Sequence, residues 1–401
     1  MLERVLPLSL AGLLCLFGAL AVGACDSGSD TPPPEEEEEE EPSCESSADC
    51  AATPDTPFCD EVCEALPEGH QLGVGDGSPE SVNLPLIMVP DKARRSTDLA
   101  WNPAVANQLW VLNSSDDSVM VVEQAGFEDA TWQRLHDPAA AHFMNNSPAL
   151  SFGEVVPTYG QTFAVCGDND NGGNDFMGPA LFTADLSVFA KPTPTGLGSH
   201  LDMLHSTSYC RGIEHIEKSI YFAFNSDKES LDKYNFNVDH GPGNDDHSDG
   251  EVWRYGAGEV KGVDGVVSHM AYDDESKVLY VADTGNKRIV ALDTTSGTMG
   301  ASFSGDEPAD RNMIDGATLT AIVTTGLEAP SGIELHDDLL FVSDNATSQI
   351  HAFDLTGKLL NSLDTGLAPG SLAGMAFGPE DGKLYFVDMI TSRVLRVDPK
   401  L

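Results

Sequence analysis

Between residues 82 and 401 the chain alternates short apolar stretches with turns rich in glycine, aspartate and asparagine. The apolar stretches recur in pairs, which predicts antiparallel β-strands joined by tight turns. A pair returns roughly every 40 to 60 residues, and this repetition favours a β-propeller over a sandwich. The six copies are Thr97–Trp101 with Leu109–Asn113, Pro148–Phe152 with Thr162–Cys166, Arg211–His215 with Ile220–Asn225, Ser268–Tyr272 with Leu279–Asp283, Ser331–Leu335 with Leu340–Asp344, and Ala373–Phe377 with Leu384–Asp388.

The sixth copy continues into a third strand, Arg393–Asp398, and the sequence stops soon afterwards at Leu401. That blade would therefore lack an outer strand and leave an unpaired edge, which propellers avoid by closing the ring. The apolar segment Leu84–Val89, just before the first copy, is the nearby candidate for the missing strand. The sequence thus predicts an all-β fold, a six-bladed β-propeller over residues 82–401, closed by pairing of Leu84–Val89 with Arg393–Asp398.

The fourth copy reads LYVADTGNKRI over Leu279–Ile289 and closely resembles the NHL repeat, whose units form propeller blades. The resemblance covers most of residues 90–401 and is strongest in the last three copies. Peptidylglycine amidating lyase is a six-bladed enzyme of this type that holds zinc with histidines from different blades, so the resemblance implies a ligand near His269. The other histidine-rich segments do not match that lyase's motifs. The resemblance leaves a metal-dependent lyase or a lactonase-type hydrolase as an alternative function.

The first 24 residues have the features of a secretory signal: a charged start, an apolar run over Val5–Val22, and small residues before Cys25. The run contains Pro7 and several glycines, and it is not a membrane span. The sequence Val-Gly-Ala-Cys ending at Cys25 resembles a bacterial lipobox, in which the cysteine is acylated. We therefore expect a lipoprotein held to a membrane through a lipid anchor at Cys25. Its location would be the cell envelope, exposed to the periplasm or the cell surface.

Two short segments separate this signal from the repeats. Residues 25–43 include seven consecutive glutamates, Glu35–Glu41, which cannot bury apolar surface and predict a solvated, disordered tether. Residues 44–66 are rich in Pro, Asp and Ser and predict a small disulfide-stapled module, because the envelope is oxidising. A zinc knuckle is the weaker alternative, since CxxC pairs are absent. The disulfide candidates are Cys44, Cys50, Cys59 and Cys63 in this module, and Cys166 with Cys210 between blades two and three.

The formal net charge is −44. This charge excludes nucleic acid as a partner, because phosphate binding requires clustered Lys and Arg. An acidic surface keeps a protein soluble and attracts cations. We expect a monomer whose small-molecule or protein ligand at the propeller face is not specified by the sequence, and a non-catalytic interaction platform is a further alternative function.

Histidine is unevenly distributed, since eight of the eleven histidines lie between His136 and His269. His215 occupies a core position of its repeat, and we expect His136 and His142 to be surface residues. The others fall at the start of blade four and in two insertions: His200–His205, which enters blade three, and Asp239–Asp249, which we place between the second and third strands of that blade. We expect the insertions to emerge on one face of blades three and four and to form a divalent metal site there, with zinc favoured over copper, iron or manganese. The candidate ligands are His200, Asp202, His205, Asp239, His240, His247, Asp249 and His269.

A second cation site is suggested by the loop that follows Cys166. Asp168, Asp170 and Asp175 alternate there with Asn and Gly, as at the start of a calcium loop. The glutamate at the twelfth position of an EF-hand is missing, because Pro179 stands in its place. Calcium is therefore an alternative to a plain acidic turn.

Overall fold

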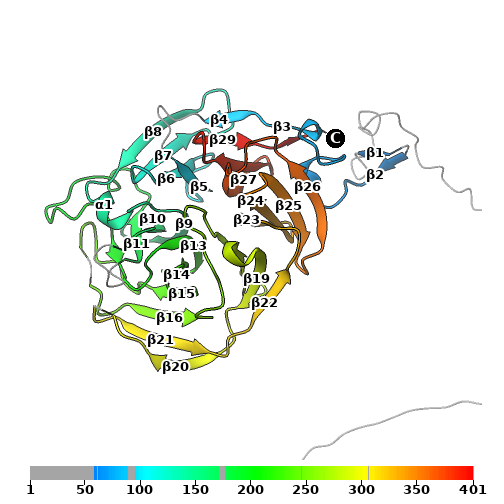
Figure 1. Cartoon of the computed structure of the whole chain (residues 1–401). Helices are drawn as coiled ribbons and strands as arrows, with labels where there is room; N and C mark the ends of the chain where they lie inside the picture. The colour runs from blue at the N-terminus through cyan, green and yellow to red at the C-terminus, as the bar shows by residue number, and fades with distance from the viewer. Residues whose placement is uncertain are drawn as a thin grey trace, which may run out of the picture.

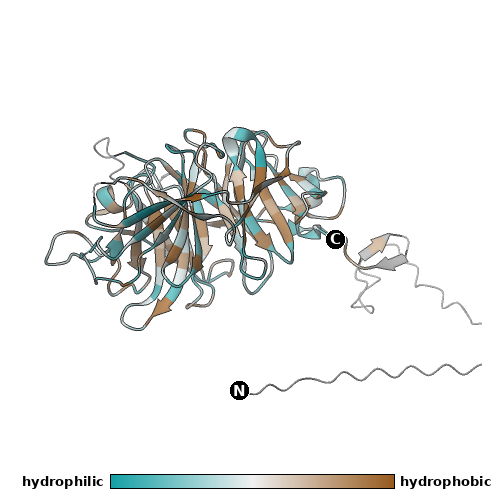
Figure 2. Ribbon diagram, turned by 90° about the horizontal axis from the view of Figure 1, so that it is seen from below, coloured by the Kyte–Doolittle hydropathy of each residue, from teal (hydrophilic) through white to brown (hydrophobic). Residues whose placement is uncertain are grey.

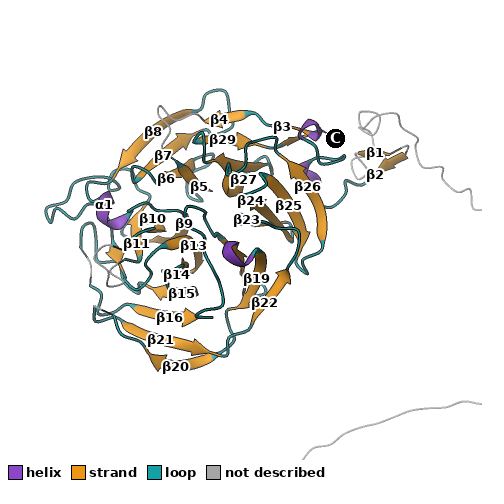
Figure 3. Cartoon of the chain, viewed as in Figure 1, coloured by secondary structure: helices purple, strands orange, loops and turns teal. Residues whose placement is uncertain are grey.

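The computed structural model describes residues 58–60, 62–88, 95–170, 177–244, 246–305 and 307–400. The described residues form six sheets arranged as blades around a central axis, which confirms the all-β, six-bladed β-propeller (Figure 1). Among the described residues strands dominate, and helical structure is confined to single turns (Figure 3). These turns are η2 (His70–Leu72), η3 (Pro79–Ser81), α1 (Ala140–Phe143) and η4 (Thr284–Asn286).

In the first three blades the strands follow one another outward from the axis. Blade one comprises β5 (Ser96–Trp101), β6 (Leu109–Asn113), β7 (Ser118–Glu123) and β8 (Thr131–His136). Blade two comprises β9 (Leu150–Val156), β10 (Gly160–Cys166), β11 (Pro179–Thr183) and the short β12 (Asp202–Met203). Blade three comprises β13 (Cys210–Glu217), β14 (Ile220–Asn225), β15 (Ser230–Asn235) and β16 (Glu251–Tyr255).

The last three blades carry the strongest repeats. Blade four comprises β17 (Met270–Asp273), β18 (Val278–Asp283), β19 (Arg288–Asp293) and β22 (Leu319–Val323). Blade five comprises β23 (Pro330–His336), β24 (Leu339–Asp344), β25 (Gln349–Asp354) and β26 (Leu359–Asp364). Blade six comprises β27 (Leu372–Phe377), β28 (Leu384–Asp388), β29 (Arg393–Arg396) and β4 (Leu86–Met88).

The ring is closed by a strand from the other end of the chain, as the sequence predicts. Strand β4 pairs antiparallel with β29, with Met88 opposite Val394 and Leu86 opposite Leu395. A second pair follows, because β3 (Val82–Asn83) lies antiparallel to β30 (Asp398–Pro399). Blade six therefore has an outer strand.

Blade three is larger than the other blades, which the sequence did not lead us to expect. Strands β20 (Thr298–Ser302) and β21 (Asp310–Asp315) are inserted between the third and fourth strands of blade four. They add to blade three instead, where β21 runs parallel to β16 and widens the sheet to six strands. The segment linking β20 to β21 is thereby carried to the outer edge of blade three.

The hydrophobic core lies between neighbouring blades. Apolar strand residues occupy the interior of the body, whereas its loops are more polar (Figure 2). Between blades one and two, for example, the fully buried Trp110 packs edge-on against Phe152 and Phe163. Such aromatic packing fixes how adjacent sheets meet.

A disulfide joins the second strand of blade two to the innermost strand of blade three. Cys166 and Cys210 are bonded, with a Cα–Cα distance of 5.8 Å, as expected from the sequence. In the N-terminal module β1 (Phe58–Asp60) pairs with β2 (Val62–Glu64), and Cys59 is disulfide-bonded. The acylation candidate Cys25, the tether, and Cys44 and Cys50 lie outside the described residues. Within the described part of the chain no helix is long and apolar enough to cross a membrane.

Candidate functional site

The two histidine-rich segments lie together, but at the outer edge of the propeller rather than on the face shared by blades three and four. Residues 236–250 connect β15 to β16, the third and fourth strands of blade three, whereas the sequence suggested the second and third. This loop packs on the last strand of blade two: the Gly243 N–H donates to the His200 carbonyl at 2.7 Å, and the His240 N–H donates to the Leu201 carbonyl at 3.0 Å. The candidate ligands therefore meet between blades two and three.

The first cluster of candidate ligands consists of His205, His247 and Glu307. The Nδ1 atoms of His205 and His247 lie 2.5 and 3.2 Å from the same oxygen, Oε2 of Glu307. Two ligand atoms bound to one tetrahedral zinc ion lie about 3.4 Å apart, since each is 2.0–2.1 Å from the metal. The two nitrogen–oxygen distances are thus within about 1 Å of that spacing, and the three ligand atoms lie within 4.8 Å of one another.

The cluster is shielded from solvent. The side chains of His205 and Glu307 are 3% and 4% exposed, whereas that of His247 is 22% exposed. Burial alone would raise the pKa of Glu307, but the hydrogen bond from His205 and the nearby histidines outweigh it and lower that pKa. Glu307 is therefore an anion at neutral pH, which is the form in which a carboxylate can bind a metal ion.

Arg311 fixes the carboxylate of Glu307 from its own strand, β21. Its NH2 lies 2.7 Å from Glu307 Oε1, which also accepts the His205 backbone N–H at 2.9 Å, whereas both imidazoles contact Oε2. Its NH1 donates to the Glu307 and Ala309 carbonyls at 2.8 and 2.9 Å, and its Nε donates to Ser206 Oγ at 2.9 Å. One guanidinium thus ties the β20–β21 segment to the residue that follows His205. Outer groups of this kind orient ligands in metal sites.

A second cluster lies on the same pair of segments. Nε2 of His240 is 3.4 Å from Oδ1 of Asp249 and 3.9 Å from Oδ2 of the fully buried Asp202. The one site expected from the sequence is therefore divided into two groups, each with three candidate ligand atoms within 4.8 Å of one another.

Three sequence candidates join neither group. His200 is fully buried, stacks on Phe143 with ring centroids 3.6 Å apart, and donates from Nδ1 to the Leu197 carbonyl. His269 lies at the propeller axis, where its Nδ1 is 3.5 Å from Asp98 Oδ1. Asp239 belongs to neither three-residue group. The His269 position is explained by its strand: β17 is the innermost strand of blade four, and the insertions lie at the circumference.

Glu307 was missed by the sequence analysis, although a signal for it exists. The chain advances 37 residues from Asp293, where β19 ends, to Pro330, where β23 begins. The corresponding advance in blade five, from Asp354 to Leu372, is 18 residues. This surplus marks an inserted element in blade four, and a carboxylate within it is a ligand candidate.

The calcium candidates are arranged differently from a calcium loop. The carboxylate of Asp168 accepts a hydrogen bond from Arg211, whose other terminal nitrogen contacts Asp264 at 2.9 Å. Asp170 accepts from Ser208 at 3.4 Å, and Asp175 lies outside the described residues. A guanidinium from within the chain therefore already supplies the positive charge beside Asp168.

Comparisons with known proteins support the fold. No family profile and no curated protein sequence matches the chain. Among solved structures, a luciferin-regenerating enzyme is 13% identical over 79% of this chain and 95% of its own, with a TM-score of 0.50. A protein of unknown function from Bacteroides thetaiotaomicron is 9% identical over 86% of this chain and 79% of its own, with a TM-score of 0.51.

A calcium-binding protein, regucalcin from Agrobacterium tumefaciens, is 10% identical over 80% of this chain and 96% of its own, with a TM-score of 0.49. At such identities the likeness concerns the fold alone. The candidate ligands of this chain therefore have to be argued from their own geometry.

Proposed function

We propose that this chain is a metal-binding β-propeller displayed on the bacterial cell envelope, in which His205, His247 and Glu307 hold one divalent transition metal ion. The observation that carries the proposal is the convergence of two imidazole nitrogens on one Glu307 oxygen, at 2.5 and 3.2 Å. Imidazole with carboxylate suits zinc, and the same ligand set also accepts iron, copper or manganese.

A further feature supports this assignment. The net charge of −44 raises the local concentration of cations around the protein. The envelope location rests on the signal-like N-terminus and on Cys25. In such a protein the tether would hold the propeller away from the membrane.

Metal content measured on the purified protein tests the proposal. After treatment with a chelator and reloading with Zn²⁺, we expect one ion to bind per chain and to be lost when His205→Ala and His247→Ala are combined. His136→Ala is the matched control, because His136 is an exposed histidine at the edge of blade one. His240→Ala distinguishes the clusters and should leave this ion bound. The proposal fails if the double variant binds zinc with the stoichiometry and affinity of the parent.

A lyase or lactonase-type hydrolase is a second candidate function, favoured by the number of ligands. Three protein ligands leave one position of a four-coordinate ion open, whereas structural zinc sites use four. Loading the protein with Co²⁺ and adding azide separates the two cases. A shift of the visible spectrum indicates an exchangeable position and favours catalysis, and an unchanged spectrum favours a closed site.

A further inference from the structure

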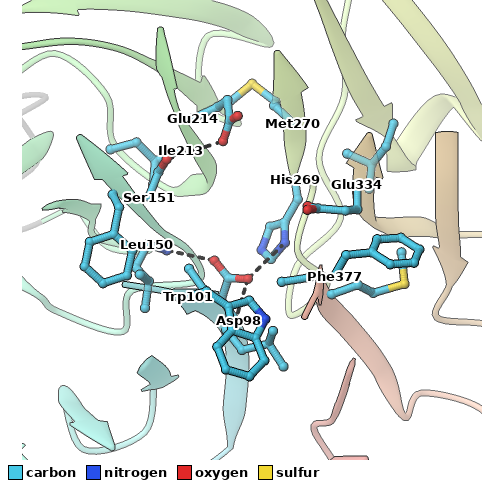
Figure 4. A pocket seen from close by; sticks show the side chains of 16 residues that line it. Asp98, Trp101, Leu150, Ser151, Ile213, Glu214, His269, Met270, Glu334 and Phe377 are labelled. Carbon is cyan, nitrogen blue, oxygen red and sulfur yellow. Dashed lines mark hydrogen bonds and ion pairs between the residues drawn. The ribbon is translucent and has the colours of Figure 1, made fainter. Parts of the chain in front are cut away.

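The propeller axis contains a cavity of about 270 Å³ that the proposed metal site does not use (Figure 4). Its wall is made by the innermost strands of all six blades. One apolar ring surrounds it, with one side chain from each blade, and these side chains are all at most 4% exposed. The ring consists of Leu99, Leu150, Ile213, Met270, Ile333 and Met375.

Four titratable side chains reach into this cavity: Asp98, Glu214, His269 and Glu334 (Figure 4). Asp98 and His269 stand one position before the apolar ring and contact each other at 3.5 Å. Blade six has Gly374 at the equivalent position, where a Cβ would collide with Asp98 and lie 3.0 Å from the His269 ring. This glycine makes room for the pair.

Glu214 and Glu334 stand one position after the apolar ring, in blades three and five. Each accepts a hydrogen bond from a backbone N–H of the next blade: Glu214 from Tyr272 at 3.3 Å, and Glu334 from Phe377. Asp98 and His269, one position before the ring, are each 6% exposed, whereas the two glutamates, one position after it, are half-buried. Solvent exposure thus increases along the inner strands. The cavity therefore opens toward the end of these strands, where Trp101 and Phe377 also line it.

The charge of the cavity is not balanced from within the chain. Among the described residues no lysine or arginine forms an ion pair with Asp98, Glu214 or Glu334, and His269 is the only basic side chain that contacts one of them. Burial, together with repulsion from the neighbouring carboxylates, raises the pKa of both glutamates to about 8. Carboxyl groups in an apolar cavity are costly when ionised and unpaired, so a cationic guest would stabilise them.

A metal ion does not fit this arrangement. All four titratable groups lie among the described residues, yet no three of them bring ligand atoms within 4.8 Å of one another. Coordination at the usual distances of 2.0 to 2.6 Å would require such an approach. The apolar ring and the aromatic side chains at the mouth instead suit an organic group that carries a positive charge, because aromatic faces attract cations.

We propose that the axial cavity binds a small organic amine, with its ammonium group between Glu214 and Glu334 and its carbon chain against the apolar ring. The volume admits a molecule of a few carbon atoms and is close to the lower limit for small-molecule sites, which begin at about 300 Å³. This site is separate from the cluster of His205, His247 and Glu307, which lies at the circumference.

Calorimetric titration of the purified protein with n-butylammonium and 1,4-diaminobutane tests the proposal. We expect binding of at least one of the two amines and none of 1-butanol, which has the same carbon chain without the charge. Because the glutamates hold protons near neutral pH, binding should also release protons. The measured heat should then depend on the ionisation enthalpy of the buffer.

Two variants and one control locate the binding. Glu214→Gln and Glu334→Gln should each weaken amine binding at least about tenfold, since each removes one partner of a buried charge pair. Glu217→Gln, on the same strand as Glu214 but exposed and outside the cavity wall, should leave it unchanged. Thermal unfolding of each variant shows whether the fold persists.

The proposal is overturned if neither amine binds. It is also overturned if 1-butanol binds as tightly as n-butylammonium, which would make the cavity merely apolar, or if both glutamine variants bind amine as tightly as the parent protein. Loss of zinc binding in Glu214→Gln and Glu334→Gln would also overturn it, because the axial cavity would then be the metal site. Failure of the metal site alone, with amine binding intact, leaves this proposal standing.

Discussion

Arg311 contacts Glu307 at Oε1, with NH2 2.7 Å away, whereas the imidazoles of His205 and His247 contact Oε2. The guanidinium therefore sets the direction of Oε2 without occupying the space of a metal ion. Both residues are almost fully buried, at 3% and 4% exposure of their side chains. Orientation of the proposed ligand thus depends on a residue that need not touch the ion.

Arg311→Gln is expected to lower zinc affinity about 10- to 100-fold, the usual effect of losing a group that orients a ligand. Competition with a chromophoric chelator measures the affinity. Arg311→Lys keeps the charge without the fork of donors and should fall between the parent and Arg311→Gln. Arg134→Gln, which breaks a partly exposed ion pair in blade one, is the control. Parent-like affinity in a folded Arg311→Gln protein would contradict a positioning role.

Stability should respond to pH through Glu334. Its pKa is raised from 4.5 to about 8, chiefly by burial, so between these values the folded state keeps a proton that the unfolded state loses. Stability therefore falls as pH rises through this window. Glu334→Gln removes the effect, and the free energy of unfolding of the variant relative to the parent should be higher at pH 8 than at pH 5. Denaturant titrations at the two pH values measure it. Glu217→Gln should show no such difference, and an equal effect of Glu334→Gln at both pH values would refute the prediction.

The disulfide between Cys166 and Cys210 spans 44 residues of sequence. A crosslink over that length restricts the unfolded chain and typically stabilises a protein by about 2–4 kcal/mol. The double variant Cys166→Ala/Cys210→Ala should lose about this much in the free energy of unfolding. Reduction of the parent with dithiothreitol is the parallel measurement and should give a similar loss. An unchanged midpoint in both experiments would show that the bond contributes nothing.

The closing strand β4 offers a comparison within one element. Met88 is 3% exposed and packs in the cluster between blades six and one, whereas Leu86 is 49% exposed. Met88→Ala should cost about 2–5 kcal/mol of unfolding free energy, because it removes buried contacts and leaves a cavity. Leu86→Ala should stay within about 0.5 kcal/mol, as exposed substitutions do. Similar losses at the two positions would mean that β4 does not pack in solution as described.

Cys25→Ser tests the proposed anchor. Without a thiol to acylate, the expressed protein should move from the detergent phase to the aqueous phase in a Triton X-114 partition, because an anchored protein owes its membrane affinity to the acyl chains. Cys15→Ser, in the proposed signal segment, should leave partition unchanged. Detergent-phase recovery of Cys25→Ser would disprove lipidation at this residue.

The sequence predicts those parts of the fold in which the strands that pair by hydrogen bonds are also marked by an apolar side-chain pattern. The role of β4 could be predicted, because an unpaired edge on blade six required a strand and Leu84–Val89 was apolar. Strand β20 could not, since its residues are mostly exposed and give no apolar alternation. Its place in blade three depends on pairing between β21 and β16, which the local sequence does not indicate.

The location predicted for the candidate site was wrong for a related reason. Strand β15 carries Asp232 and Lys233 at its centre and does not resemble a buried strand. In the structure Asp232 is fully buried, and Arg254 donates to its two oxygens at 2.8 and 2.7 Å. Because this buried ion pair lies at the centre of β15, the apolar pattern does not reveal the strand. The loop after β15 was therefore placed between the second and third strands of blade three instead of the third and fourth.

Ring closure by β4 also bears on the order of folding. Leu86 pairs with Leu395, so the contact encloses about 310 residues of chain. The entropic cost of such a loop grows with the logarithm of its length, and contacts between distant residues form late. Blades one to five can therefore assemble before the ring closes, whereas blade six needs both β4 and β29. Until then β29 presents an open edge, and this stage is the one at which nascent chains are most prone to aggregate.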